Sequence, residues 1–299
     1  MNRFSPLFLG LSLAVAGVTL SAAQETASTT PSMPKVLQIT REFIKPYKNG
    51  AAHDKTESAF VQAMTRAHWP THYIALSSMS GKLRSLYLFP YASFDAWQKD
   101  SDAIAKNAAL AAEVDRASVA DGELLESVDQ AVGYYNEEAS YRPSADLSHD
   151  RYFEIDLYHV RPGHEVEWDE LVKLVKDADE KAGNDEHWAL FDLVFGTQGG
   201  SHLVLSAKKS LAEVDSGFAG QKQFYAALGE DGMKKFIELI ASAVESSDHE
   251  LFSINPRQSY PPEEWVKADP GFWKPKSAAS TAKPAAAPGA KAGEAEKKP

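Results

Sequence analysis

The chain carries one pattern twice, and this repeat limits its possible folds more than any single residue does. Residues 36–50 read VLQITREFIKPYKNG, and residues 152–164 read YFEIDLYHVRPGH. Each stretch alternates apolar and polar residues as a half-buried strand does, then reaches a basic residue and a proline, which cannot donate to a sheet. Because internal repeats decide an architecture before local features are read, we expect two copies of one structural unit.

Each copy continues with the same predicted elements. A helix follows the first strand, and in the first copy Asp54 and Glu57 resemble a capping box at its start. Alternating segments on both sides of short Ser/Gly-rich stretches predict hairpins over residues 73–89 and 188–207. Helical sequence follows each hairpin, and a short strand closes each copy. The last helices are predicted to begin near two Asp-Gly pairs, Asp121-Gly122 and Asp231-Gly232.

The order β-α-β-β-α-β is ferredoxin-like, an antiparallel sheet with helices on one face. Two such sheets can cover each other through their open faces. We therefore predict an α+β fold in which tandem ferredoxin-like β-α-β-β-α-β repeats form a dimeric-α/β-barrel-type structure within one chain.

A family resemblance supports this prediction. The segment FEIDLYHVRPGHEVEWDELVKLV (153–175) resembles the opening of NIPSNAP-type domains, which are relatives of the antibiotic-biosynthesis monooxygenase group in the dimeric α/β-barrel superfamily. The first copy departs from the pattern, with Gln38 in place of Glu154 and Glu42 in place of Tyr158. The resemblance implies the barrel fold. It leaves the chemistry open, because the superfamily includes cofactor-free monooxygenases, haem proteins and members without known activity.

The two ends of the chain predict its location. Arg3, an apolar run and small residues up to Ala23 are typical of a cleaved signal peptide. The chain has no cysteine, which excludes disulfides and a lipidated cysteine. We expect an exported bacterial protein, periplasmic or secreted. The predicted segments are a signal peptide (1–23), a disordered spacer (24–34), the first repeat (35–143), a linker (144–150), the second repeat (151–258), a Pro/Trp-rich arm packed on the body (259–276) and a disordered Ala/Pro/Lys tail (277–299).

Charge and hydropathy restrict the partners. The net charge is −11, and no dense Lys/Arg run appears in the body. The chain therefore has no electrostatic footprint for nucleic acid or anionic lipid. After the signal peptide no apolar run approaches membrane-spanning length. We expect a small apolar or aromatic molecule as the partner, and either a monomer with an intrachain barrel or a homodimer.

The sequence lacks the strong catalytic motifs of zinc proteases, phosphate-binding loops, nucleophile elbows and dinucleotide folds. Candidates therefore come from the strand faces. His159 shares a face with apolar residues that we expect to pack against the helices, either as a satisfied core residue or at a pocket. The predicted ligand-binding residues of that pocket are Trp168, Trp188 and Phe191, with Arg41 on the matching face of the first copy.

Acidic residues alternate with that apolar face. Glu154, Asp156 and Tyr158 are predicted to point into the barrel interior, together with Glu42 of the first copy. Carboxylates in a closed interior can have raised pKa values and serve proton transfer. The alternative interpretation is a wet, hydrogen-bonded seam inside the barrel.

Three functions remain open at this point. The first is a small-molecule-binding protein of the bacterial envelope without established catalysis. The second is a cofactor-independent monooxygenase or isomerase acting on an aromatic substrate, with His159, Tyr158 and Glu154 as the catalytic acid–base residues. The third is a haem protein with His159 or His187 as the axial ligand. Only the third requires a cofactor, and no metal site is predicted.

Overall fold

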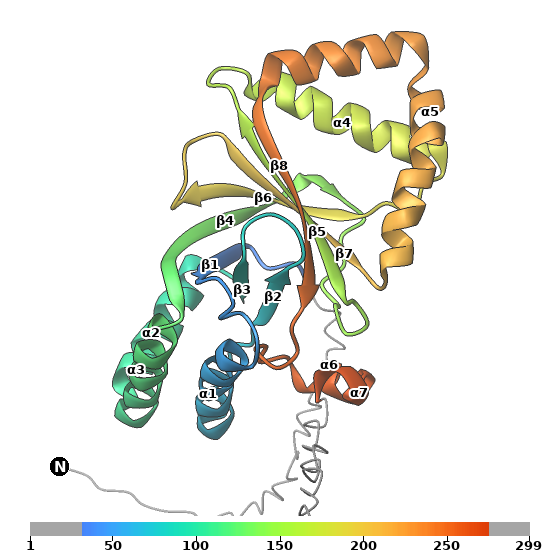
Figure 1. Ribbon diagram of the computed structural model, residues 1–299. Helices are drawn as coiled ribbons and strands as arrows, with labels where there is room; N and C mark the ends of the chain where they lie inside the picture. Colours follow the sequence, from blue (N-terminus) through green and yellow to red (C-terminus); the bar gives the residue numbers. More distant parts are fainter. Residues whose placement is uncertain (1–31, 275–299) are drawn as a thin grey trace, which may run out of the picture. The chain divides into compact units, whose positions relative to one another are not determined.

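Eight antiparallel strands form a closed barrel in the computed structural model, which describes residues 32–274 (Figure 1). Around the barrel the strands follow the order β1-β3-β2-β8-β5-β7-β6-β4. The fold is therefore α+β and the barrel closes within one chain. The strands are β1 (Val36–Ile44), β2 (Ile74–Ser78), β3 (Arg84–Tyr91), β4 (Leu125–Tyr141), β5 (Tyr152–Val160), β6 (Trp188–Phe195), β7 (Ser201–Lys208) and β8 (Val244–Ile254).

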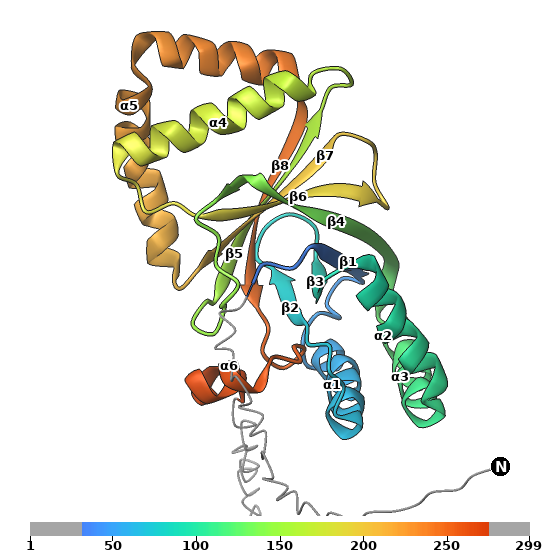
Figure 2. The ribbon, with the colours of Figure 1, turned by 180° about the vertical axis from the view of Figure 1, so that it is seen from behind.

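The five longest helices lie outside the barrel in two groups. Figures 1 and 2 show α1, α2 and α3 on one side of the strands and α4 and α5 on the other. None of the helices in the described part of the chain is long and apolar enough to cross a membrane. The helices are α1 (Ala51–Ala67), α2 (Phe94–Lys106), α3 (Ala108–Gly122), α4 (Glu165–Ala182), α5 (Leu211–Ala243), α6 (Glu263–Ala268) and α7 (Pro270–Trp273).

The strand pairing has the same form in both halves. β1 lies between β3 and β4, and β5 lies between β7 and β8. The pairs β2–β8 and β4–β6 join the halves into the barrel. The two predicted hairpins are confirmed as β2–β3 and β6–β7. That these halves are a tandem repeat stays a prediction.

The orientation predicted for β1 and β5 is wrong. Phe153 and Ile155 belong to the buried apolar core that fills the barrel, whereas Glu154, Asp156 and Tyr158 line the space between the sheet and α4–α5. Alternation separates the two faces of a strand. It does not identify the inner face here, because barrel side chains cover one face and helices cover the other.

The predicted last helices are also displaced. In the first half, α3 ends at Gly122, and the residues after it form the long strand β4 instead of a helix. In the second half, Asp231 lies inside α5, which bends at Gly229. Apolar residues three or four positions apart fit a helix, but Val128 on β4 is 51% exposed and so belongs to no buried helical stripe.

The segment after β8 packs on the barrel. Trp265, Phe272 and the buried Trp273 contact the barrel core, and Trp273 Nε1 donates a hydrogen bond to the Ser148 carbonyl oxygen at 2.9 Å. An ion pair between Arg151 and Asp269 holds the same segment. The predicted signal peptide, most of the spacer, the last residues of the arm and the Ala/Pro/Lys tail lie outside the described residues.

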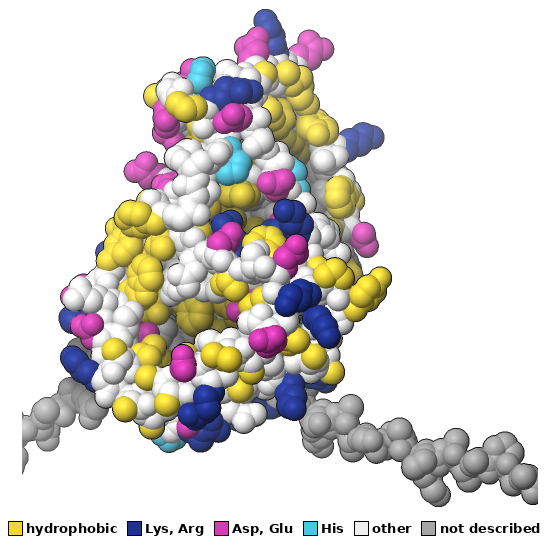
Figure 3. Space-filling view, turned by 60° about the vertical axis from the view of Figure 1, so that its left-hand side comes forward, with side chains coloured by type: hydrophobic (Ala, Val, Ile, Leu, Met, Phe, Trp, Pro, Cys, Tyr) yellow, Lys and Arg dark blue, Asp and Glu magenta, His cyan; other side chains and the backbone are white. Residues whose placement is uncertain are grey.

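Figure 3 shows one face of the molecule, on which patches of hydrophobic side chains lie between interspersed acidic and basic ones.

Candidate functional site

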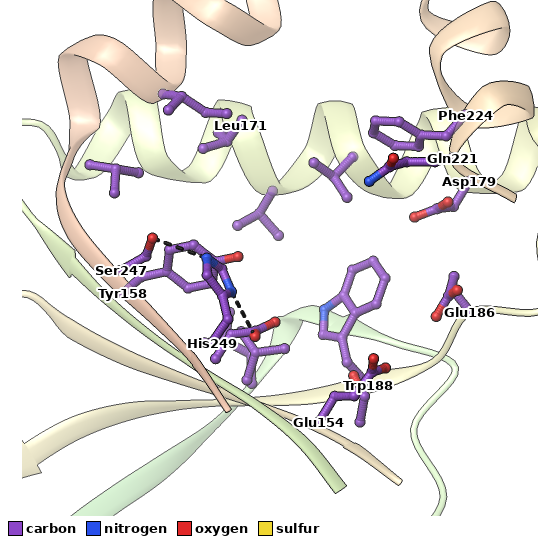
Figure 4. A pocket seen from close by; sticks show the side chains of 18 of the residues that line it. Glu154, Tyr158, Leu171, Asp179, Glu186, Trp188, Gln221, Phe224, Ser247 and His249 are labelled. Carbon is purple, nitrogen blue, oxygen red and sulfur yellow. Dashed lines mark hydrogen bonds and ion pairs between the residues drawn. The ribbon is translucent and has the colours of Figure 1, made fainter. Parts of the chain in front are cut away.

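A cavity of about 930 Å³ lies between the outer face of the second-half strands and helices α4 and α5 (Figure 4). Figure 4 shows Tyr158 and Trp188 on the sheet side, Leu171 on α4 and Phe224 on α5, all at this space. Aromatic and aliphatic side chains supply most of the lining. The bulky apolar members include Trp168, Leu171, Trp188, Phe218, Phe224 and Phe236.

Helix α5, which forms one wall of the cavity, changes direction at Gly229. Gly229 has φ 68° and ψ −175°, a conformation that is essentially confined to glycine. Figure 1 shows α5 turning between two helical arms, one of which lies beside α4. The bend allows α5 to cover the apolar stripe of α4 without closing onto the sheet, and space remains between the two layers.

One histidine–carboxylate pair lies on the cavity wall. The β5–β8 register places Asp156 opposite His249, and His249 Nδ1 is 2.8 Å from Asp156 Oδ1. His249 Nε2 is 3.1 Å from Ser247 Oγ. Because a carboxylate only accepts, Nδ1 carries the imidazole proton and the lone pair of Nε2 is directed toward Ser247. The His249 side chain is 60% exposed, so the pair is at a solvent-accessible part of the cavity.

Tyr158 lies beside this pair as a neutral phenol. Burial and the negative charge of Asp156 raise the pKa of Tyr158 well above its usual value. Its ring centroid is 5.1 Å from that of Trp168 and 5.8 Å, in an edge arrangement, from that of His249. At neutral pH Tyr158 can therefore donate a hydrogen bond to a bound molecule but cannot serve as a base.

A buried lysine pairs with two carboxylates of the cavity wall. Lys208 is 3% exposed, and its Nζ lies 3.2 Å from Glu154 Oε2 and 3.0 Å from Glu186 Oε2. Burial alone would lower the pKa of Lys208, but the Glu186 and Glu154 carboxylates raise it above its usual value. Lys208 stays charged, and both carboxylates are held in ion pairs. Glu154 is thus less available for proton transfer than the sequence suggested.

The structure brings only some of the predicted site residues together. Trp168 and Trp188 line the cavity, with Tyr158 and Glu154. His159 lies on the opposite face of β5, with Nδ1 2.8 Å from Ser201 Oγ, and Phe191 is buried inside the barrel. Arg41 forms an ion pair with Asp129. The predicted pocket of His159, Phe191 and Arg41 with the two tryptophans is therefore wrong, because these three belong to the inner barrel face.

Glu42 lies in the first half, on the outer face of β1 beneath α1. Its Oε2 is 3.2 Å from His53 Nε2. The predicted capping box is wrong, because α1 begins at Ala51 after Gly50 and Asp54 is inside the helix. Glu57 on α1 is 3% exposed, and its carboxylate lies close to Glu42, His53 and Asp121. Sequence reasoning missed this cluster, although the separation of His53 and Glu57 by one helical turn is a visible signal for a shared face.

The comparisons with known proteins show resemblance in fold only. No family model and no curated protein matches the chain. A solved structure of a proposed monooxygenase from Lactobacillus acidophilus NCFM is 9% identical, with 75% of this chain and 94% of that chain covered and a TM-score of 0.47. An anthrone oxidase-like protein is 11% identical (74% and 92% covered, TM-score 0.45). Chlorite dismutase from Candidatus Nitrospira defluvii is 6% identical (79% and 96% covered, TM-score 0.45).

These similarities carry no argument about function, since every TM-score among them is below 0.5 and the identities are 6–11%. The fold of this chain rests on its own strand pairing. Membership of the NIPSNAP-type group stays a prediction.

Proposed function

We propose that this chain binds a largely apolar, aromatic small molecule in the cavity between the sheet and α4–α5. The cavity itself carries this proposal. Its volume of about 930 Å³ lies within the range of about 300–1,000 Å³ usual for small-molecule sites, and it combines aromatic walls with a few polar groups. An aromatic ligand ring can pack against Trp188, which is only partly buried, and such ring contacts contribute binding energy beyond buried area.

The polar groups indicate the chemistry of the ligand. Glu154 and Glu186 share Lys208, and Asp156 is paired with His249. The lining is acidic overall, so an anionic ligand would be repelled. A neutral aromatic compound with an ionisable hydroxyl fits better, because its O–H can replace the Ser247 hydroxyl, which lies 3.1 Å from Nε2, as the donor to His249.

A second candidate function is proton-transfer catalysis on that ligand, and the His249–Asp156 pair favours it. Nε2 would take a proton from an acidic O–H or C–H group, Asp156 would stabilise the imidazolium, and the proton would return at another atom of the ligand. This is isomerase chemistry without a cofactor. The monooxygenase form would also need dioxygen as co-substrate. In either form His249 takes the role that the sequence assigned to His159.

Haem receives no support from the geometry. His159 faces Ser201, and His187 Nε2 lies 2.7 Å from the Ala207 carbonyl oxygen. Neither histidine lines the cavity between the sheet and α4–α5. The two residues predicted as axial ligands do not fit a haem in this space, and we propose no step that uses it.

Filling the cavity tests the binding proposal. Val175 projects from α4 into the cavity, so Val175→Trp should occupy the ligand volume. Val119→Trp is the control, because Val119 on α3 is 67% exposed. Native mass spectrometry of the purified wild type identifies the retained ligand, and thermal shifts with that compound and related phenols measure binding. We expect affinity to fall at least about 100-fold, about 2.7 kcal/mol, in Val175→Trp alone. Equal binding by both variants would place the ligand elsewhere.

Two substitutions separate the possible roles of the His249 group. His249→Gln should abolish proton transfer while leaving binding within about threefold. Ser247→Ala should leave turnover nearly unchanged if Nε2 acts directly on the ligand. Loss of turnover in Ser247→Ala, with labelling of Ser247 by a fluorophosphonate, would instead indicate a nucleophilic serine. NMR in D₂O measures proton exchange at the ligand. If the ligand bound without any such exchange, the chain would be a binding protein without proton-transfer activity.

We also propose export to the bacterial envelope, a monomer or homodimer in solution, and a tandem ferredoxin-like origin of the two halves. The sequence of residues 1–23 supports export, and the matching strand pairing of the two halves supports the tandem origin. Expression in a bacterial host with analysis of the periplasmic fraction tests export. The mature chain should begin at Gln24. Light scattering gives the oligomeric state.

A further inference from the structure

Four acid–base side chains meet beneath α1 in the first half, far in the fold from the aromatic cavity. His53 and Glu57 lie one turn apart on α1, and Asp121 lies near the end of α3. Glu42 reaches them from β1. One ligand atom from each residue lies within 4.8 Å of the others. We call these four residues, Glu42, His53, Glu57 and Asp121, the buried cluster.

The cluster is shielded from solvent. His53 is 0% exposed, Asp121 2% and Glu57 3%. Two carboxylate oxygens, Glu57 Oε1 and Asp121 Oδ2, are buried without a hydrogen-bond partner. An unpaired buried acceptor is unfavourable, and more so when it carries charge. Both oxygens belong to the same small group of atoms, so one ligand could satisfy both.

The charge balance points to a cation. Three carboxylates share one imidazole, and among the described residues no lysine or arginine forms an ion pair with them. Uncompensated buried charges are strongly unfavourable, and proteins neutralise them by protonation, pairing or metal binding. The Glu57 carboxylate lies against those of Glu42 and Asp121, with one oxygen of each within 4.8 Å of the others. A bound cation would remove this repulsion.

We propose that the buried cluster binds one divalent transition-metal ion, which joins β1, α1 and α3. The donor set is one imidazole nitrogen and carboxylate oxygens, which suits Mn²⁺, Fe²⁺ or Zn²⁺ better than the softer thiolate-seeking ions. Metal–ligand bonds of about 2.0–2.2 Å place the donor atoms about 3.4 Å apart. His53 Nε2 lies 3.2 Å from Glu42 Oε2 and 3.6 Å from Asp121 Oδ1. Because three of the four ligands are almost fully buried, the ion has a structural role.

Neighbouring side chains complete the site. Gln258 is 1% exposed, and its Nε2 lies 3.2 Å from His53 Nδ1. With an ion on Nε2, the imidazole proton is on Nδ1. The Gln258 amide, whose Nε2 also donates to Asp54 Oδ1 at 3.0 Å, must then turn so that Oε1 accepts that proton. Thr56 Oγ1 donates to Asp121 Oδ1 at 2.5 Å and fixes that carboxylate. Metal ligands are commonly oriented by such second contacts.

The test uses the untagged protein and Mn²⁺ or Zn²⁺ alone as probes. Plasma mass spectrometry of the purified chain should find one transition-metal ion per chain. After chelation, titration with either ion should restore one site, and the melting temperature should rise by about 5–10 °C at 100 times the Kd. Co²⁺ should give visible absorption bands of a site with nitrogen and oxygen donors.

Two variants separate specific binding from adventitious binding. Glu57→Gln and His53→Gln should each remove the stoichiometric ion and the metal-dependent shift. Asp179→Asn is the control, because Asp179 is 5% exposed on α4 and its pKa is also raised by burial. This variant should keep the ion. Should the purified wild type hold no metal and the stripped chain bind neither ion, the cluster is a proton-sharing group and the proposal is overturned. Equal metal loss in all three variants overturns it too.

Discussion

The two helical layers place different side chains at corresponding points of one scaffold. Both α1 and α4 end in a residue with left-handed backbone. Counted back from that residue, His53 corresponds to Trp168, and Glu57 corresponds to Val172. The first half therefore presents an imidazole and a carboxylate where the second presents an indole and a valine. Each pair faces the outer surface of the barrel.

The strands below show the same exchange. Glu42 on β1 stands four residues before Pro46, and Tyr158 on β5 stands four residues before Pro162. In the first half, α3 packs beside α1 and the polar groups meet within 4.8 Å. In the second half, the bent helix α5 leaves about 930 Å³ over Tyr158 and Trp168. Different side chains at a few corresponding positions thus accompany two outcomes. The helices of the first half enclose a polar cluster, and those of the second half leave an aromatic cavity.

The largest expected effect is on stability in the first half. His53→Ala removes the imidazole that lies among three carboxylates, two of them almost fully buried, so we expect a loss of about 3–5 kcal/mol in the free energy of unfolding. His249→Ala removes a histidine of the second half that is 60% exposed, and should change it by about 0.5 kcal/mol or less. Urea unfolding measures both. Similar losses in the two variants would break the distinction between a buried cluster and an open cavity wall.

The bend in α5 should have the next largest effect. Gly229→Ala forces a side chain into a conformation that is essentially confined to glycine, and we expect a loss of about 1–3 kcal/mol with altered ligand affinity. Gly199→Ala is the control, since Gly199 has no positive φ and a Cβ there would meet nothing within 4 Å. If Gly229→Ala retained both stability and affinity, the cavity would not depend on the bend.

The pH dependence of the metal-free and metal-bound protein should differ in sign. Glu57 has a pKa above its unfolded value, so in metal-free protein its contribution to stability is complete below about pH 4.5. That contribution is lost as pH rises through the folded pKa, because the ionised carboxylate is then buried beside other negative charges. Saturating Mn²⁺ should reverse the trend, because binding releases the shared protons.

Unfolding from about pH 5 to about pH 8 tests this reversal. The groups that face Glu57 are Glu42, His53, Asp121 and Tyr87. Glu57→Gln should flatten the metal-free profile by removing one titrating group. An unchanged profile in that variant would mean that another member of the cluster holds the proton.

The sequence predicts much of the fold, because its strongest signals are local. Alternation and turn residues predicted both hairpins and the strand before each proline. The inner and outer faces of β1 and β5 could not be predicted in the same way. Leu37 on β1 faces the inside of the barrel, and Glu154 on β5 faces the helices. Alternation separates these two faces, but only barrel closure through β2–β8 and β4–β6 determines which face is inside.

The candidate sites depend on contacts between distant segments. Trp168 and Trp188 were predictable as pocket residues, because both are large apolar side chains near a strand or helix start. The His249–Asp156 pair needed the β5–β8 register, which no local pattern supplies. Asp121 joins His53 only because α3 packs beside α1. Helical spacing could have suggested that His53 and Glu57 share a face, but not that Glu42 and Asp121 join them.

The smallest expected effect concerns the position that differs most in chemistry between the halves. Tyr158 is a neutral phenol whose ring packs against Trp168, and phenylalanine keeps that ring, so Tyr158→Phe should change stability by about 0.5 kcal/mol or less.

The matched substitution in the first half, Glu42→Gln, should weaken Mn²⁺ binding at least about tenfold, because it removes a charged ligand. Calorimetry of both variants with Mn²⁺, and ligand thermal shifts of both, would complete the comparison. A Tyr158→Phe variant that bound ligand normally but lost turnover would make the phenol the proton donor of the second half. Loss of binding as well would limit Tyr158 to holding the ligand.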